Sequence, residues 1–438
     1  MKSGILLLIL AAVFATAADF EVRHLNNGLT VIVSPDDISP VVTICIAVKT
    51  GATCETPETN GLAHFYEHMF FKGNSALPDQ TAYRQRMGEL GIINNGATST
   101  ERVWYHITLG SDNLKEGLQF MFDAITSPLF DMVEMERERD VIMNEYERKT
   151  SHPLWLLWLA QEQLIFADAP WRQSAIGVPE VILAAAPPAM EYFQEMYYTP
   201  DNSALIISGD VDCEEAFMFA EQLFSPWEYG GRSNYDMLPR LVSIKKDTTV
   251  YVDSPSGAGF VSVIFEGPSI STDQGESYPA DVWGSYLGLM SREYYTDLVT
   301  NGPFISISGS YYTQRFSPVI SFSGMVHPDR AEEALNLLLE EIEQLQSPDY
   351  YDAEGLILAK EELDRHRIMA EETSQDVAIE SLPFWWVVAG NLEYYSTYSD
   401  SINAVEPEDI NSFLETWIKG KPHAAFIMMP LDIEESQQ

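Results

Sequence analysis

Short apolar runs alternate with longer amphipathic runs along this chain, and no other feature of the sequence constrains its fold more. Residues 41–48 form a β-branched run that is typical of a buried strand, whereas residues 331–345 carry apolar side chains at helical spacing. Interleaved strands and helices predict an α/β or α+β fold, in which helices cover a sheet. A length of 438 residues allows about two to three domains.

The alternation occurs twice, in two runs of similar length and order. Between them, residues 225–246 are rich in proline, glycine and polar residues and are the best candidate for a linker. We therefore predict one domain at residues 19–237 and a second at residues 238–438. The similar order hints at a duplication, although no strong residue-level repeat accompanies it.

The individual elements can be given as ranges. Strands are predicted at 20–25 and 29–33, joined by the turn dipeptide Asn27-Gly28, and at 41–48, 103–109, 204–208, 250–252, 261–265 and 319–325. Helices are predicted at 61–70, 113–126, 134–149, 154–166, 331–345 and 353–369.

The N-terminus has the composition of an export signal. Lys2 precedes the apolar run 5–18, which is short for a bilayer span, and Ala15-Thr16-Ala17 offers the small residues that signal peptidase accepts. We predict a signal peptide at residues 1–18 and an exported protein, either in the bacterial periplasm or secreted; a buried strand or a membrane anchor is the alternative. No later stretch of transmembrane length is free of charge, so we expect no stable membrane anchor in the mature protein.

Acidic side chains outnumber basic ones by 66 to 25, which gives a formal net charge of −41. Such a polyanion should repel nucleic acid and anionic membranes, so neither is expected as a partner. The charge indicates either a solvated surface or an acidic chamber that attracts basic peptides.

Three cysteines, Cys45, Cys54 and Cys213, are too few and too uneven for a disulfide framework. Cys45 lies in an apolar run and is expected in the core. A bridge between Cys45 and Cys54 remains open.

The segment from His64 to His68 carries the pattern of a metal site. His64 and His68 are four residues apart, so on a helix their rings lie one turn apart on one face, as two zinc ligands do. Glu67 then lies beside the metal, where its carboxylate can take a proton from the attacking water and pass it to the leaving amine. This is the inverzincin order of the motif. An accidental surface cluster is the alternative.

A third ligand has to come from another element. Glu138 and Glu145 are seven residues apart and project from one side of a predicted helix, so either could supply it. Most acidic pairs at this spacing are solvated, and the residues alone leave the choice open.

The segment from Gly61 to Asn74 closely resembles the signature of the pitrilysin/insulysin family of zinc metallopeptidases, which includes the mitochondrial processing peptidase. By this resemblance zinc would be held by His64, His68 and Glu145, because the family places its third ligand at that distance from the second histidine. Glu138 would support the site as a neighbouring carboxylate, and the run from Glu138 to Glu145 is itself similar to the family.

Further matches extend the resemblance over nearly the whole mature chain, strongly for residues 20–225. The segment from Asn95 to Glu101 resembles the edge strand on which substrate adds as an extra strand, so Asn95, Ala97 and Thr98 would bind substrate. The implied fold has two homologous halves, each a mixed β-sheet flanked by helices, which face each other as a clamshell around a chamber. A length near that of this chain is typical of the short subfamily, whose members work as dimers.

One region departs from the family pattern. Active members usually bring an Arg and a Tyr from a C-terminal half, but in residues 291–305 the arginine position is Val299 and the tyrosine position falls on Ile305 or its neighbour. Neither side chain can donate a hydrogen bond to an oxyanion. We hypothesise that a partner subunit supplies the pair, with a misalignment as the alternative. Three nearby residues are expected to be strand residues first: Tyr311, Tyr312 and Arg315.

Other residues are expected to be structural. His106 lies in the predicted strand 103–109 and should be a packed or surface histidine, and Trp155 and Trp158 share one helical face and should lie in the core.

The sequence therefore predicts a zinc-dependent endopeptidase with one Zn²⁺ per chain and Glu67 as its catalytic residue. Its substrates would be peptides or unfolded segments that enter an internal chamber, and the chain would be the metal-bearing subunit of a heterodimer. Two alternatives remain: a non-catalytic peptide-binding or structural subunit that retains the site, and a zinc hydrolase that acts on non-peptide amides.

Overall fold

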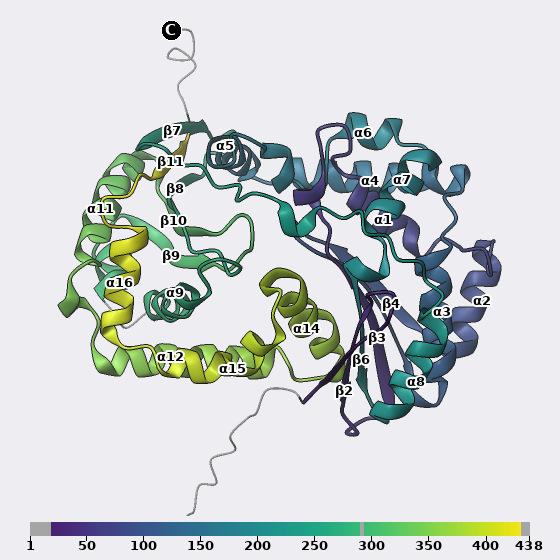
Figure 1. The fold of residues 1–438 in the computed structure, drawn as a ribbon. Helices are drawn as coiled ribbons and strands as arrows, with labels where there is room; N and C mark the ends of the chain where they lie inside the picture. The colour runs from purple at the N-terminus through teal and green to yellow at the C-terminus, as the bar shows by residue number, and fades with distance from the viewer. Residues whose placement is uncertain (1–18, 290–292, 431–438) are drawn as a thin grey trace, which may run out of the picture.

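The computed structural model describes residues 19–289 and 293–430, and these form two β-sheets flanked by helices (Figure 1). Each sheet is mixed, because it contains one parallel pair among antiparallel ones. The predicted class, an α/β fold of two halves with a helix-flanked mixed sheet in each, is confirmed. The predicted signal peptide at residues 1–18 lies outside the described residues.

The first sheet has six strands in the order β1-β2-β6-β3-β5-β4. Its strands are β1 (Glu21–His24), β2 (Thr30–Pro35), β3 (Val41–Val48), β4 (Ile93–Thr98), β5 (Val103–Gly110) and β6 (Ser203–Gly209). The predicted hairpin is present, since β1 pairs antiparallel with β2 across Gly28, whose φ of 93° suits glycine. Strand β3 is buried along nearly its whole length between β5 and β6, as its β-branched composition predicts.

The second sheet has five strands in the order β7-β11-β8-β10-β9. Its strands are β7 (Thr248–Asp253), β8 (Gly259–Glu266), β9 (Phe304–Tyr312), β10 (Val319–Val326) and β11 (Ala424–Met429). Strand β11 was not predicted, and of β9 only its last two residues, Tyr311 and Tyr312, were expected in a strand. Among the described residues, β4 lies at one edge of the first sheet and β9 lies at one edge of the second. The two sheets are therefore arranged in a similar way.

Helices cover both sheets. The first run contains α1 (Leu62–Phe70), α2 (Gln80–Leu90), α3 (Leu114–Thr126), α4 (Met132–Thr150), α5 (Trp155–Ile165), α6 (Pro179–Ala184), α7 (Pro187–Tyr197) and α8 (Cys213–Phe224). The second contains α9 (Gln274–Leu287), α10 (Glu293–Tyr295), α11 (Ala331–Gln344), α12 (Ala353–Met369), α13 (Ser374–Asp376), α14 (Leu382–Phe384), α15 (Leu392–Asn403) and α16 (Pro407–Trp417). In the part of the chain that is described, none of these helices combines the length and the apolar character that crossing a membrane requires.

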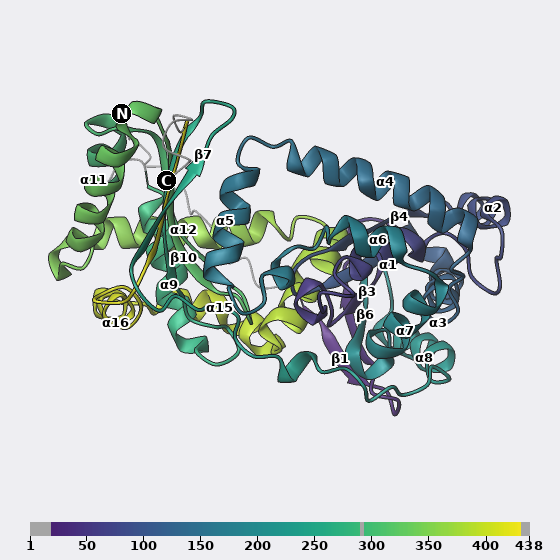
Figure 2. The same cartoon turned by 90° about the horizontal axis from the view of Figure 1, so that it is seen from above.

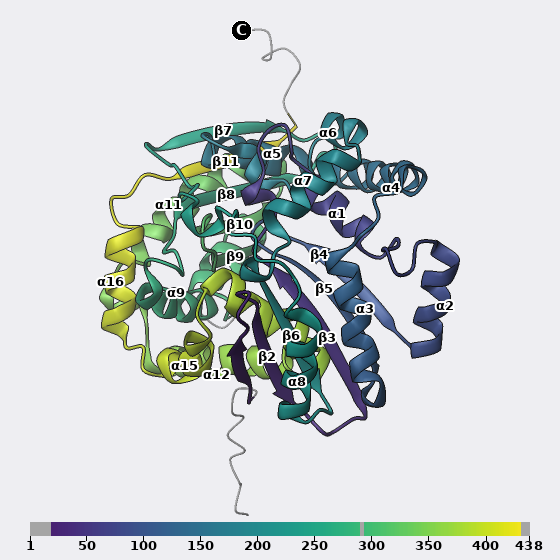
Figure 3. The ribbon, with the colours of Figure 1, turned by 45° about the vertical axis from the view of Figure 1, so that its right-hand side comes forward.

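The two halves exchange helical cover. Helix α5 lies between α4 and α6 of the first half in sequence but packs against β7 and β11 of the second sheet. In the other direction, residues 374–389, which include α13 and α14, pack on β3 and β6 of the first sheet. Figures 1 and 2 show α5 beside the second sheet, and Figure 3 shows both sheets with their helices from a third side. The boundary between residues 237 and 238 therefore stays a sequence prediction, since packing crosses it in both directions.

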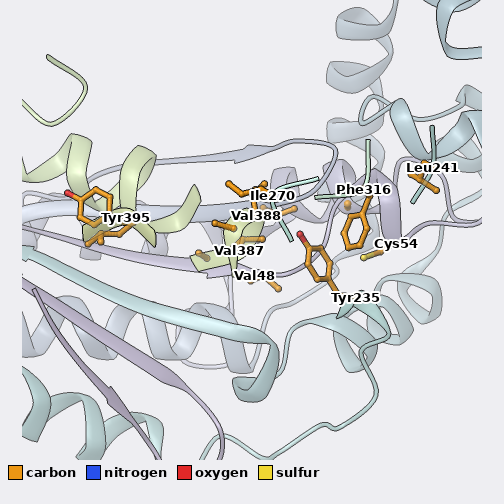
Figure 4. Close-up of a cluster of buried hydrophobic side chains, with 14 of the residues drawn as sticks. Val48, Cys54, Tyr235, Leu241, Ile270, Phe316, Val387, Val388 and Tyr395 are labelled. Atoms are coloured by element: carbon orange, nitrogen blue, oxygen red, sulfur yellow. The ribbon is translucent and has the colours of Figure 1, made fainter. Parts of the chain in front are cut away.

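The predicted linker is irregular in structure but tightly packed. Trp227, Tyr235 and Leu241 are buried, and the backbone N–H of Leu241 donates to the carbonyl of Phe316 at 2.8 Å. Figure 4 shows Tyr235, Leu241 and Phe316 in one apolar cluster with Val48 of the first half and Val387 of the second. The linker thus joins the halves through a shared core.

All three cysteines are free thiols. The bridge that was left open between Cys45 and Cys54 is not formed. Cys45 is fully buried on β3, as expected for a core residue.

Candidate metal centre

Helix α1 places two imidazoles on one face. The helix begins after Gly61, whose φ of 103° lies in the left-handed region, and it buries Phe65 and Met69 against the core. His64 and His68 lie on a neighbouring, half-buried face of the helix, one turn apart. Their Nε2 atoms are 3.3 Å from each other, so both lone pairs can meet at one point.

Helix α4 brings a carboxylate to the same point. The side chain of Asp131 caps α4 by accepting from the N–H groups of Val133 and Glu134. About four turns further along, Oε2 of Glu145 lies 3.4 Å from Nε2 of His64 and 3.7 Å from Nε2 of His68. The structure thus brings together the three residues that the sequence predicts as ligands.

The three atoms fit a zinc ion. Two ligands about 2.0–2.1 Å from a tetrahedral ion lie roughly 3.3–3.4 Å apart, close to the observed separations of 3.3 to 3.7 Å. Burial, with a smaller effect of His68, lowers the pKa of His64 to about 3, so its ring is neutral and can offer a lone pair. Three protein ligands leave the fourth tetrahedral position for water or substrate, which is the pattern of a catalytic site rather than a structural one.

Glu138 supports one of the two imidazoles. Its Oε2 lies 3.0 Å from Nδ1 of His68, and its Oε1 accepts from the ammonium of Lys72 at 2.6 Å. Burial would raise the pKa of Glu138, but the hydrogen bonds from His68 and Lys72 outweigh it and lower that pKa. A carboxylate in this position fixes the tautomer and orientation of the ring. Lys72 lies in the signature segment from Gly61 to Asn74, and its place four residues after His68 is the signal that could have indicated this contact.

His64 has no such support. Its Nδ1 is buried and makes no hydrogen bond to any of the described residues. The two rings are therefore held by different means.

Glu67 lies beside this group but is not part of it. Its Oε2 accepts a hydrogen bond of 2.6 Å from the hydroxyl of Thr98 on β4. Burial raises the pKa of Glu67, while the bond from Thr98 opposes this effect. A carboxylate beside a metal-bound water can act as a general base and then as a general acid. The contact between Thr98 and Glu67 was missed, because nothing in the sequence shows which side chains of β4 face α1.

Strand β4 presents an edge next to Glu67. It pairs with β5, where Asn95 is opposite His106 and Ala97 is opposite Trp104, and no second strand pairs with it among the described residues. Asn95 is exposed and Ala97 is half-buried, so the free side of this strand can accept an extended peptide. Of the three predicted substrate-binding residues, Thr98 also contacts the candidate base.

The structure shows where the two residues that depart from the family pattern, Val299 and Ile305, lie. Val299 lies in a helical turn before β9, and Ile305 lies on β9 with 49% of its surface exposed, so neither brings a hydrogen-bond donor. Residues 291 and 292 of this region lie outside the described residues. Tyr311 and Tyr312 end strand β9, as expected.

Two structural expectations were wrong. Arg315 is not a strand residue: it lies in the connection between β9 and β10, where its guanidinium forms an ion pair of 2.9 Å with Asp236. Trp155 and Trp158 are half-buried rather than core, because α5 lies between the two halves and keeps one side open. His106 is a packed residue, 5% exposed.

Two family models match this chain. The model described as Insulinase (Peptidase family M16) matches residues 30–164, and the one described as Peptidase M16 inactive domain matches residues 187–367.

Curated relatives of this chain are named as proteases or peptidases. An uncharacterized zinc protease of Rickettsia felis is 28% identical over 219 residues, which is 50% of this chain and 52% of that one. A mitochondrial-processing peptidase subunit beta of Lentinula edodes is 28% identical over 288 residues, 64% of this chain and 61% of that one. The matched region thus spans about half to three-fifths of these relatives.

Solved structures share the fold. A protease from Helicobacter pylori superposes with a TM-score of 0.83 and 19% identity, over 94% of this chain and 100% of that one. The periplasmic protease PqqL from Escherichia coli superposes with a TM-score of 0.75 and 16% identity, over 95% of this chain and 49% of that one. Likeness at such low identity shows the arrangement of the two halves.

Proposed function

The chain belongs to the insulinase family, peptidase family M16, and on this premise we propose that it is a zinc-dependent endopeptidase that cleaves peptides or unfolded segments. The convergence of His64, His68 and Glu145, with Glu67 beside them, is the observation that carries the proposal. Relatives named zinc proteases support zinc as the metal. We propose one ion per chain, because the described residues hold one such group of ligands.

His64, His68 and Glu145 would hold the ion. Zinc bound there would lower the pKa of a water molecule and polarise the scissile carbonyl. Glu138 and Lys72 would keep the His68 ring oriented, with its Nε2 directed to the site.

Glu67 would act as general base and then general acid. Its half-buried carboxylate, which accepts a hydrogen bond from the Thr98 hydroxyl, would take a proton from the attacking water and pass it to the leaving amine. The free edge of β4 would hold the substrate as an added strand, with Asn95, Ala97 and Thr98 along it. The backbone of the substrate would then lie next to the carboxylate that transfers the proton from water to the leaving amine.

The side chains of Val299 and Ile305 carry no hydrogen-bond donor that could stabilise the oxyanion. We infer that a partner subunit supplies an Arg/Tyr pair, so that this chain is the metal-bearing subunit of a heterodimer. The similarity to a processing peptidase subunit beta supports this inference, because such a name implies a second subunit. One missing hydrogen bond to an oxyanion typically costs about 3 kcal/mol, so the chain alone should be a weak enzyme.

We also propose that the protein is exported, either to the bacterial periplasm or by secretion. It is supported by the composition of residues 1–18 and by the likeness to a periplasmic protease. Detection of the mature N-terminus near residue 19 in a periplasmic or culture fraction would test it, and an uncleaved N-terminus in the cytoplasmic fraction would contradict it.

The peptidase proposal can be tested with two matched variants. Glu67→Gln should keep zinc and lose at least about 100-fold in cleavage rate, because it removes only the proton-transfer group. Glu145→Gln should lose zinc itself. Bound metal and cleavage of an unstructured peptide would be measured for each variant, with and without a candidate partner chain of the same family.

Zinc binding without cleavage in every combination would favour the non-catalytic subunit and overturn the peptidase. Full activity of the purified chain, unchanged by the partner, would overturn only the heterodimer.

A further inference from the structure

The helix that carries both histidines starts without a cap of its own. The residue at its N-cap is Gly61, which has no side chain to accept hydrogen bonds from the first turn. The carboxylate of Glu55, six residues upstream, takes this role. Its Oε2 accepts from the N–H of Gly61 and its Oε1 accepts from the N–H of Ala63, each at 2.8 Å.

Glu55 is itself held rigidly. Its side chain is buried, with 1% of the residue exposed, and Oε2 also accepts from the amide of Asn60 at 2.8 Å. The same amide donates to the carbonyls of Trp171 and Ser174, and the indole N–H of Trp171 donates to the carbonyl of Glu55 at 3.1 Å. The start of α1 is therefore tied through one carboxylate to two separate loops.

The hydrogen bonds of Glu55 matter because the two imidazoles are held differently. His68 is oriented through its ring by Glu138, but the outer nitrogen of His64 has no hydrogen-bond partner among the described residues. His64 directly follows Ala63, whose N–H is bonded to Glu55. The position of the His64 ring thus depends on the backbone of the first turn of α1, and Glu55 fixes that backbone.

We propose that Glu55 is a positioning residue of the metal centre, which holds His64 through the N-terminus of α1 as Glu138 holds His68 through its ring. This inference rests on the proposed zinc function. Residues that orient ligands in this way typically change metal affinity about 10–100-fold when they are replaced.

The experiment compares Glu55→Gln with Glu58→Gln in the full mature chain. Glu58 lies in the same loop and is exposed, so its variant makes the same charge change without touching α1. In Glu55→Gln the amide NH₂ would face a backbone N–H, which breaks one of the two bonds to the helix. Zinc affinity would be measured by competition with a chromogenic chelator, and the site geometry by the visible spectrum of the Co²⁺-substituted protein.

We expect Glu55→Gln to bind zinc at least about tenfold more weakly, with an altered Co²⁺ spectrum and a lower kcat at unchanged KM. Glu58→Gln should match the wild type. Glu55→Asp keeps the charge but is one methylene shorter, so it should give an intermediate affinity, and it decides the question if Glu55→Gln does not fold.

A folded Glu55→Gln or Glu55→Asp protein with wild-type zinc affinity and Co²⁺ spectrum would overturn the inference, even if its thermal stability were reduced. A wild type that binds zinc without cleaving peptides would overturn the peptidase proposal and leave the affinity comparison valid. A wild type that binds no zinc would overturn both.

Discussion

At the scale of single residues, Glu138 lies between the ring of His68 and the ammonium of Lys72, and both contacts favour its ionised form. Glu138→Gln keeps the shape but removes the charge, so the tautomer and orientation of His68 are less firmly held. We expect zinc affinity to fall about 10–100-fold.

Chelator competition measures this effect, and Glu136→Gln is the matched control because Glu136 is exposed on the same helix. Equal affinities for the two variants would show that Glu138 has no part in the metal site.

The hydroxyl of Thr98 donates to the carboxylate of Glu67 at 2.6 Å. Thr98→Val keeps the volume of the side chain but removes this hydrogen bond, so the carboxylate of Glu67 loses the contact that orients it. A hydrogen bond to a charged group contributes about 1.5–3 kcal/mol, so kcat should fall roughly 10–100-fold while bound zinc stays unchanged.

Thr100→Val is the control for Thr98→Val, since the Thr100 side chain is half-buried in the same segment and does not touch Glu67. Steady-state kinetics with a model peptide would check the prediction, which fails if both variants have the same kcat.

At the scale of elements, two helical glycines should respond in opposite ways to alanine. In α2, a Cβ on Gly88 would meet nothing within 4 Å, so Gly88→Ala should raise the free energy of unfolding by about 0.5 kcal/mol. In α3, a Cβ on Gly117 would lie 2.8 Å from Cδ1 of Ile44 and 2.9 Å from Cδ1 of Leu109. Overpacking in a core costs about 1–3 kcal/mol, so Gly117→Ala should lower the free energy of unfolding.

Urea denaturation of both glycine variants would measure these changes. A stabilising effect of Gly117→Ala would mean that α3 packs more loosely on β3 and β5 than the structure shows.

The elements that could be predicted from sequence are those with a clear period. The hairpin β1–β2, strand β3 and helices α3, α4, α11 and α12 lie within a few residues of their predicted ranges. Residues 304–310 of β9 were missed because serine and glycine interrupt its apolar pattern, and α9 was missed because Pro279 and two glycines lie inside it. These elements form because the rest of the second half packs against them.

At the scale of the whole molecule, one carboxylate joins the two halves. Glu101 is buried at the end of the β4 segment, and it accepts from the backbone N–H groups of Arg315 at 2.9 Å and Phe316 at 2.8 Å. Burial raises the pKa of Glu101 from 4.5 to about 7, although the backbone hydrogen bonds oppose the shift.

Stability should therefore depend on pH through Glu101. The pKa of Glu101 is higher in the folded state than in the unfolded state, so protonation of this carboxyl stabilises the folded protein. This stabilisation is fully present below about pH 4.5 and is lost as the pH rises through about 7. Relative to Glu101→Gln, which cannot ionise, the free energy of unfolding of the wild type should fall by on the order of 3 kcal/mol between pH 4.5 and 8.

Urea denaturation at a series of pH values isolates this effect, since Glu55 and Asp281, whose pKa desolvation also raises to about 7, are present in both proteins. Parallel pH curves for wild type and Glu101→Gln would contradict the prediction.

The sequence alone determined the fold class and the pair of histidines, because helical spacing and β-branched runs are local properties that need no partner. By resemblance to its family, the sequence also indicated Glu145 and Glu138. Only the tertiary structure brought α4 to α1, put Thr98 on Glu67 and Lys72 on Glu138, and exchanged α5 and residues 374–389 between the halves. These contacts join residues far apart in the chain, and the packing of whole elements decides them.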